Sequence, residues 1–61
     1  MLAKFEFDSI CDAEEVYSRV FSEIGYRGGT SRFEEMIEVY ESCSDPRKVR
    51  DICVANGGKA V

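Results

Sequence analysis

The segment that most constrains the fold of this chain is an alternating stretch at its N-terminus. Ala3, Phe5 and Phe7 are apolar, and the residues between them are charged. A period of two is typical of a half-buried β-strand, so we predict one strand at residues 2–7. This strand needs a partner, because its backbone donors and acceptors are otherwise unpaired along both edges.

The rest of the chain offers no convincing partner for this strand. Residues 59–61 could pair with it but form a very short segment. We therefore predict pairing with a second copy of the chain, most simply in a two-fold dimer. The alternative is an extended arm that packs on the helices. Phe5 and Phe7 must be buried in either case, which makes them candidate partner-binding residues.

Helical patterns follow the strand. Asp12 and Glu15 resemble a capping box, and Gly25 stands where a helix usually ends. Apolar residues recur at helical spacing between these signals, which predicts a first helix at residues 12–24.

A second helix is predicted at residues 31–43. Ser31 and Glu34 form the best capping box in the chain. One face of this helix would carry the apolar residues Phe33, Met36, Ile37 and Tyr40, and another the acidic residues Glu34, Glu38 and Glu41.

The third predicted helix starts at Pro46, after the capping residue Asp45, and ends before Gly57. The predicted fold class is therefore mainly α: a short N-terminal β-strand followed by three short helices, in one domain over residues 1–61. A chain of this length allows one domain only.

Composition narrows the class of protein. The net charge of −4 argues mildly against non-specific binding to nucleic acid or membranes, and no apolar run is long enough to span a bilayer. The N-terminus does not resemble a signal peptide. Cys11, Cys43 and Cys53 are an odd number without a Cys-x-x-Cys pair, so we expect reduced thiols and a cytoplasmic protein.

We expect no enzyme activity, no metal and no cofactor. The chain has no histidine, and no serine, cysteine or lysine stands beside an obvious activating base. Without histidine, zinc would lack local ligand pairs. The segment from Arg27 to Arg32 has two glycines and two arginines before a predicted helix start, which could bind a phosphate. The interpretation that we favour is a plain connection between helices.

Several surface residues are candidates for binding a partner. Acidic residues of the second helix could dock on a basic surface, and basic residues in the first turn of the third helix oppose its dipole. A tyrosine and an arginine beside the glycines would suit an interface. With the two phenylalanines of the strand, these candidates are Phe5, Phe7, Tyr26, Arg27, Glu34, Glu38, Glu41, Arg47, Lys48 and Arg50.

Residues 2–43 resemble a ribbon-helix-helix regulator in topology. The resemblance is carried by Phe5-Glu6-Phe7 as the ribbon, Ile24-Gly25-Tyr26 at the end of the first helix and Thr30–Glu34 at the start of the second. It implies a dimer that inserts the ribbon into DNA. The ribbon would present Lys4, Glu6 and Asp8, and its two carboxylates would face phosphates. Ile24-Gly25-Tyr26 is also similar to a turn of ubiquitin-associated-type three-helix bundles, in which the strand has no place.

The leading functional hypothesis is a small non-enzymatic adaptor or inhibitor that binds another protein through the unpaired strand and the acidic helix face. Short acidic chains of this kind are common among phage and mobile-element products, which is one origin that we consider. The alternative is a dimeric DNA-binding regulator of the ribbon-helix-helix kind.

Overall fold

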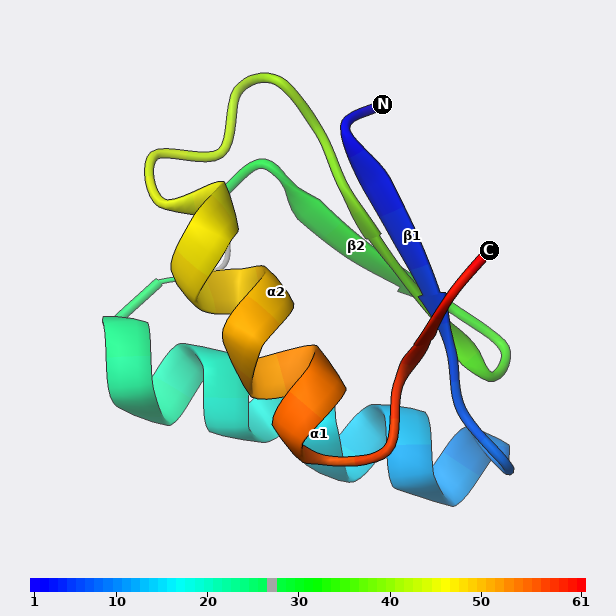
Figure 1. The fold of residues 1–61 in the computed structure, drawn as a ribbon. Coiled ribbons are helices and arrows are strands. Elements are labelled where there is room, and N and C mark those ends of the chain that lie inside the picture. The colour runs from blue at the N-terminus through cyan, green and yellow to red at the C-terminus, as the bar shows by residue number, and fades with distance from the viewer. Residues whose placement is uncertain (27) are drawn as a thin grey trace.

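The computed structural model describes residues 1–26 and 28–61. The chain forms β1 (Ala3–Glu6), α1 (Ile10–Ile24), β2 (Thr30–Phe33), β3 (Met36–Val39), α2 (Pro46–Ala55) and β4 (Lys59–Ala60). The strands make one sheet in the order β2-β3-β1-β4, in which every pair is antiparallel. Both helices cover the same face of this sheet (Figure 1). The element order is that of the ferredoxin-like, or split βαβ, arrangement.

This mixed α/β architecture contradicts the prediction of a mainly α protein with three helices. The segment predicted as a second helix, residues 31–43, contains the β2–β3 hairpin instead. Ser31 lies within β2 and does not cap a helix. The sequence gives no signal for this hairpin, because its turn residues are Glu34 and Glu35, whereas tight hairpin turns usually carry Gly, Asn or Asp. Glu34 adopts a left-handed backbone conformation with φ of 54°.

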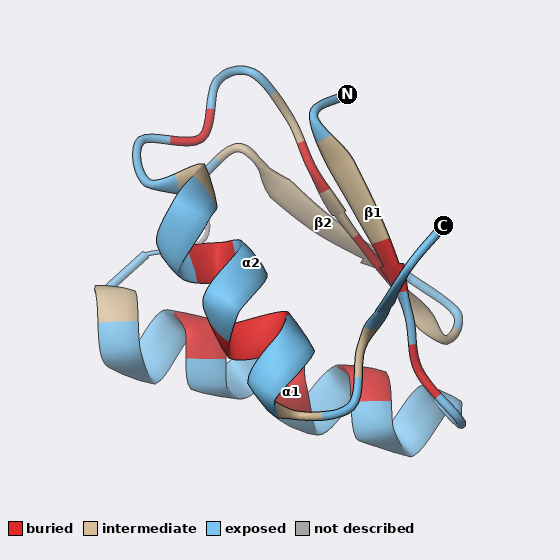
Figure 2. Ribbon diagram, in the orientation of Figure 1, coloured by how far each residue is buried: buried red, intermediate tan, exposed pale blue. Residues whose placement is uncertain are grey.

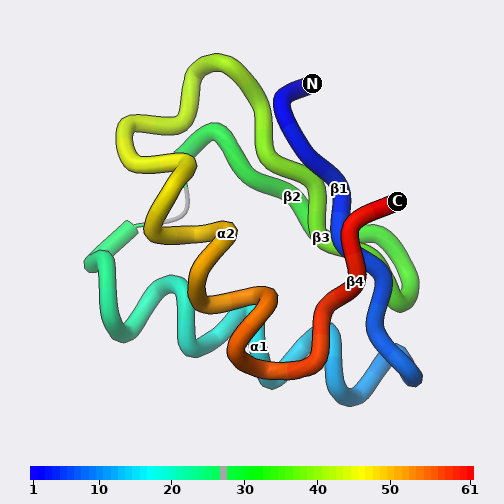
Figure 3. Tube along the Cα trace, viewed as in Figure 1, coloured from blue at the N-terminus to red at the C-terminus, as the bar shows by residue number. Residues whose placement is uncertain are grey.

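The N-terminal strand exists as predicted, but its partners lie in its own chain. β1 pairs with β3, where Phe5 lies opposite Ile37, and with β4, where Glu6 lies opposite Lys59. Figure 3 shows the C-terminal segment beside the N-terminal strand. The prediction that the strand pairs between chains is therefore wrong. The short C-terminal strand β4 pairs with one edge of β1, and β3 pairs with the other.

The two helices begin and end at residues with clear local reasons. Ser9 caps α1, because its hydroxyl accepts a hydrogen bond from the Asp12 nitrogen at 3.1 Å; the helix thus starts earlier than predicted. Gly25 ends α1 with φ of 94°. Asp45 caps α2 ahead of Pro46 as the sequence predicts, and accepts a hydrogen bond from the Lys48 nitrogen at 3.3 Å.

The hydrophobic core lies between the helices and the sheet (Figure 2). Its buried residues alternate along the strands and recur at helical spacing along the helices: Phe5, Phe7, Ala13, Val16, Val20, Ile37, Val39, Cys43, Val49, Ile52 and Cys53. Burial raises the pKa of the Cys53 thiol to about 11. In the described part of the chain, no helix is long and apolar enough to cross a membrane.

Candidate functional site

The sheet face turned away from the helices has no covering element in residues 1–26 and 28–61, and we call it the open face. Strand alternation places on it the residues between the core positions. From the edge at β2 to the edge at β4, one row of this face reads Phe33, Met36, Glu6 and Lys59, and the next reads Ser31, Glu38 and Lys4.

An apolar pair stands at the hairpin end of the open face. Phe33 is 61% exposed, and Met36, its cross-strand neighbour, is half-buried. A directly opposed aromatic and aliphatic pair stabilises a sheet through the contact of its two side chains. Here the aromatic member remains largely in water.

Carboxylates surround this pair. Glu34 and Glu35 form the turn between Phe33 and Met36, Glu6 lies opposite Met36 on β1, and Glu38 follows two residues later on the same face of β3. We name this group the hairpin patch; it consists of Glu6, Phe33, Glu34, Glu35, Met36 and Glu38.

The negative charge of the hairpin patch is only partly offset, by Lys59 opposite Glu6 and by Lys4 opposite Glu38. Among the described residues, no ion pair joins Glu6, Glu34 or Glu35 to a basic side chain. The Phe7 nitrogen donates a hydrogen bond to the Glu35 carbonyl at 2.8 Å, which ties this turn to the connection between β1 and α1. The patch thus combines an exposed aromatic ring with a negative potential.

Glu38 is held in a defined orientation. Its Oε1 accepts a hydrogen bond of 2.6 Å from the Tyr40 hydroxyl and one of 3.1 Å from the Ser31 hydroxyl. Ser31 belongs to the neighbouring strand β2 and Tyr40 follows the end of β3, so the carboxylate is held by groups from two segments of the chain. The hydrogen bond from Tyr40 is the main cause that lowers the pKa of Glu38, with smaller contributions from Ser31 and the charge of Lys4.

Two other hollows lie on the helix side of the molecule. One, of about 430 Å³, lies between α1 and the β2 edge and is bordered by Tyr17, Thr30 and Arg32, among others. The Tyr17 hydroxyl donates to the Thr30 carbonyl at 3.2 Å, and the Arg32 guanidinium lies 3.8 Å from Glu14. Tyr17 and Thr30 thus bond to each other, and Arg32 pairs with Glu14.

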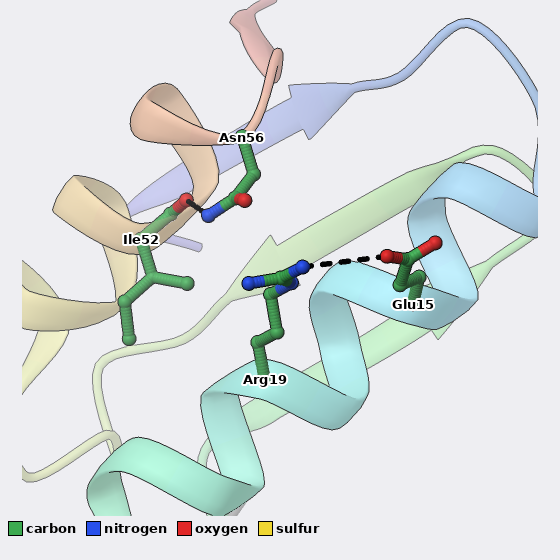
Figure 4. A network of polar contacts seen from close by, with 4 residues as sticks. All are labelled: Glu15, Arg19, Ile52 and Asn56. Carbon is green, nitrogen blue, oxygen red and sulfur yellow. Dashed lines mark hydrogen bonds and ion pairs between the residues drawn. The ribbon is translucent and has the colours of Figure 1, made fainter.

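The second hollow, of about 460 Å³, borders α2 and Glu23 of α1. Polar contacts of this layer are local, as Figure 4 shows: Arg19 pairs with Glu15 one turn away at 3.4 Å, and the Asn56 side chain donates to the Ile52 carbonyl at 2.7 Å. Basic and acidic side chains border this hollow together, which gives it no clear preference for one charge.

The structure separates the residues predicted to bind a partner. Phe5 and Phe7 are 1% and 4% exposed and belong to the core, so a partner cannot reach them. Glu34 and Glu38 come together in the hairpin patch, although on a hairpin and not on a helix. Glu41 lies beyond β3, where its carboxylate lies 3.0 Å from the Met1 amino group.

The remaining predicted residues lie elsewhere. Tyr26 is 39% exposed just after α1, and the prediction for Arg27 lies outside the described residues. The three basic residues of α2 are exposed on the helix layer: Arg47, Lys48 and Arg50.

Gly29, in the segment considered for phosphate binding, has a packing role. A Cβ on Gly29 would lie 2.2 Å from the Cys43 nitrogen, and its φ is 77°. Arg32 points to the hairpin, where its guanidinium donates to the Glu34 carbonyl at 2.6 Å. The segment joins α1 to β2 and not to a second helix, and Ser31 lies within β2.

Phe33, Met36, Glu6 and Glu35 were missed as site residues. The first two were assigned to the buried face of a helix, which the hairpin does not contain. Alternation over residues 36–39 places Met36 and Glu38 on one face and Ile37 and Val39 on the other, and Phe33 joins the first face only once a two-residue turn at residues 34–35 is recognised.

Comparison with known protein families, with curated proteins and with solved structures finds no match to this chain. Within the described residues, no group of three or more Cys, Asp or Glu side chains is placed to hold a metal ion. One fold can host many functions, so the fold alone does not define the function of this chain.

Proposed function

We propose that this chain is a small non-enzymatic protein-binding module, an adaptor or inhibitor whose hairpin patch binds a basic segment of another protein. The observation that carries this proposal is the 61% exposure of Phe33 on the edge strand β2, beside the carboxylates of the hairpin patch. An exposed aromatic anchor inside a charged rim is the usual composition of a binding hot spot.

Energetics favour a partner that covers the apolar pair. Full burial of a phenylalanine side chain contributes about 1.5–3 kcal/mol, so covering the exposed part of Phe33 would contribute roughly 1–2 kcal/mol. The surrounding carboxylates would speed the encounter with a positively charged partner and disfavour an acidic one. Apolar contact and charge thus select for the same kind of partner, a basic segment with an apolar side chain.

The same charge disfavours nucleic acid, because carboxylates repel phosphates. The ribbon-helix-helix alternative also loses its structural basis, since the segment that would be its second helix is the β2–β3 hairpin. A catalytic role for the Ser31–Glu38 contact is unfavourable: a carboxylate with a lowered pKa is a weak base and activates a hydroxyl poorly.

Selection from a displayed library of random peptides tests the proposal. We expect the selected peptides to be enriched in Lys and Arg next to aromatic or large aliphatic residues, with binding that weakens as salt rises. Phe33→Ser should abolish this binding, and Glu34→Gln combined with Glu35→Gln should weaken it.

The matched control is Val54→Ser, which removes a side chain of 56% exposure from the helix layer and should leave binding unchanged. Selected peptides without net positive charge, or binding that survives Phe33→Ser, would refute the proposed function.

A further inference from the structure

The positions around Glu38 on the open face restrict the direction from which a ligand can approach its carboxylate. Three of its four nearest positions on the open face carry groups with a defined relation to it: Tyr40 and Ser31 donate to it, and Lys4 lies opposite it on β1. The fourth direction, along β3 toward Met36 and diagonally toward Phe33, offers apolar surface only. A new hydrogen-bond donor can therefore reach the carboxylate over the apolar pair.

The two hydroxyl groups bond to the same oxygen of Glu38. Both the Tyr40 and the Ser31 hydrogen bonds end on Oε1, and no hydrogen bond to Oε2 is formed within the described part of the chain. A carboxylate fixed through one oxygen presents the other without a loss of side-chain freedom on binding, which is the benefit of preorganisation.

Phe33 lies diagonally across from Glu38 on the open face. Diagonal neighbours on one face of an antiparallel pair lie about 7–8 Å apart, within reach of a long side chain that rests on the ring. A cation over an aromatic face is attracted by the ring, and its aliphatic stem can cover Met36. Arginine suits this arrangement better than lysine, since its planar group can stack on the ring while its edge donates to a carboxylate.

We propose that the hairpin patch binds an arginine side chain of the partner protein, stacked on Phe33 and hydrogen-bonded to Glu38, with Tyr40 and Ser31 as positioning residues. This inference rests on the proposed function and names the group that the basic partner inserts.

The experiment uses the tightest peptide from the library selection, with each basic residue made in turn as Arg, Lys or citrulline. At one position we expect Lys to bind about five- to tenfold more weakly than Arg, and citrulline, which keeps the planar shape but not the charge, to bind more weakly still. Glu38→Gln should reduce the preference for Arg over Lys to within about twofold. Glu23→Gln, on α1, is the matched control and should retain it.

The positioning role is tested through pH. In Tyr40→Phe the pKa of Glu38 should rise toward that of an ordinary glutamate, so binding of the Arg peptide should decline at a higher pH than in the wild type. A merely structural effect would lower the affinity equally at every pH. Lys4→Gln should strengthen binding by about twofold, because it removes a competing cation.

An Arg preference below about twofold at every position, or one that survives Glu38→Gln, would overturn the arginine inference. If Phe33→Ser still abolishes binding in that case, the proposed function stands without it. If Phe33→Ser leaves binding unchanged, both fail.

Discussion

Glu34 at the hairpin turn offers a direct test of the β2–β3 hairpin. It is the one non-glycine residue with a positive φ among the described residues, at 54°. A left-handed conformation costs an ordinary L-residue about 1–2 kcal/mol, and glycine adopts it without that cost. The greater conformational freedom of glycine in the unfolded chain offsets this gain, because it destabilises the folded state by about 0.5–1 kcal/mol. Glu34→Gly should therefore raise the free energy of unfolding by about 0.5–1 kcal/mol.

Glu35→Gly is the matched control, because it removes the same charge from the neighbouring position. No left-handed strain is relieved there, so this variant should lose about 0.5–1 kcal/mol. For a domain of this size, 1 kcal/mol moves the Tm by about 4–8 °C, and the two variants should therefore melt on opposite sides of the wild type. Urea unfolding followed by circular dichroism would confirm the sign of each change.

The competing structure predicts a different result. In a helix over residues 31–43, both glycines would lie inside the helix, and each would cost about 1 kcal/mol. Equal destabilisation by the two variants would therefore refute the hairpin and, with it, the hairpin patch.

Three further predictions concern the core, the cap and the titration of the open face. Phe5→Ala should cost about 3–5 kcal/mol, enough to unfold most of the population of so small a domain, which a lost Tm transition would reveal. Ser9→Ala should lower the urea midpoint by the equivalent of about 1 kcal/mol, and Asp12→Ala should lower it less, by about 0.3–0.5 kcal/mol for the lost charge in the first turn of α1, which separates the observed cap from the predicted one. Because the pKa of Glu38 is lowered in the folded chain, its stabilising effect is present above the ordinary glutamate pKa and is lost as the pH falls through the folded value. A carbon-detected NMR titration should show Glu38 protonating at a lower pH in the wild type than in Tyr40→Phe.

The elements with strong local signals could be predicted from the sequence. The alternation at Ala3, Phe5 and Phe7 located β1, and the capping residue and proline at Asp45 and Pro46 located the start of α2. Each of these signals depends on neighbours in the chain only. The first turn of α1 was misplaced because Ser9 and Asp12 are both good capping residues, and the choice between them depends on where the chain leaves β1.

The hairpin could not be predicted in the same way. Phe33, Met36, Ile37 and Tyr40 fit the helical period, while the alternation of Met36, Ile37, Glu38 and Val39 fits a strand equally well. What decides between them is tertiary: β1 needs a partner, and Ile37 and Val39 complete the core beneath the helices. The candidate site followed from this decision, since Phe33 is a core residue in a helix and an exposed anchor in a hairpin.

The strand alternation of β3 also determines how this protein can change. Its even-numbered positions face outward and its odd-numbered positions hold the core, so substitutions at Met36 or Glu38 change the open face while Ile37 and Val39 keep the domain folded. A deletion or insertion of one residue would exchange the two sets, exposing the aliphatic side chains and burying a carboxylate. This surface therefore tolerates substitutions at its outward-facing positions but not a change in the length of β3.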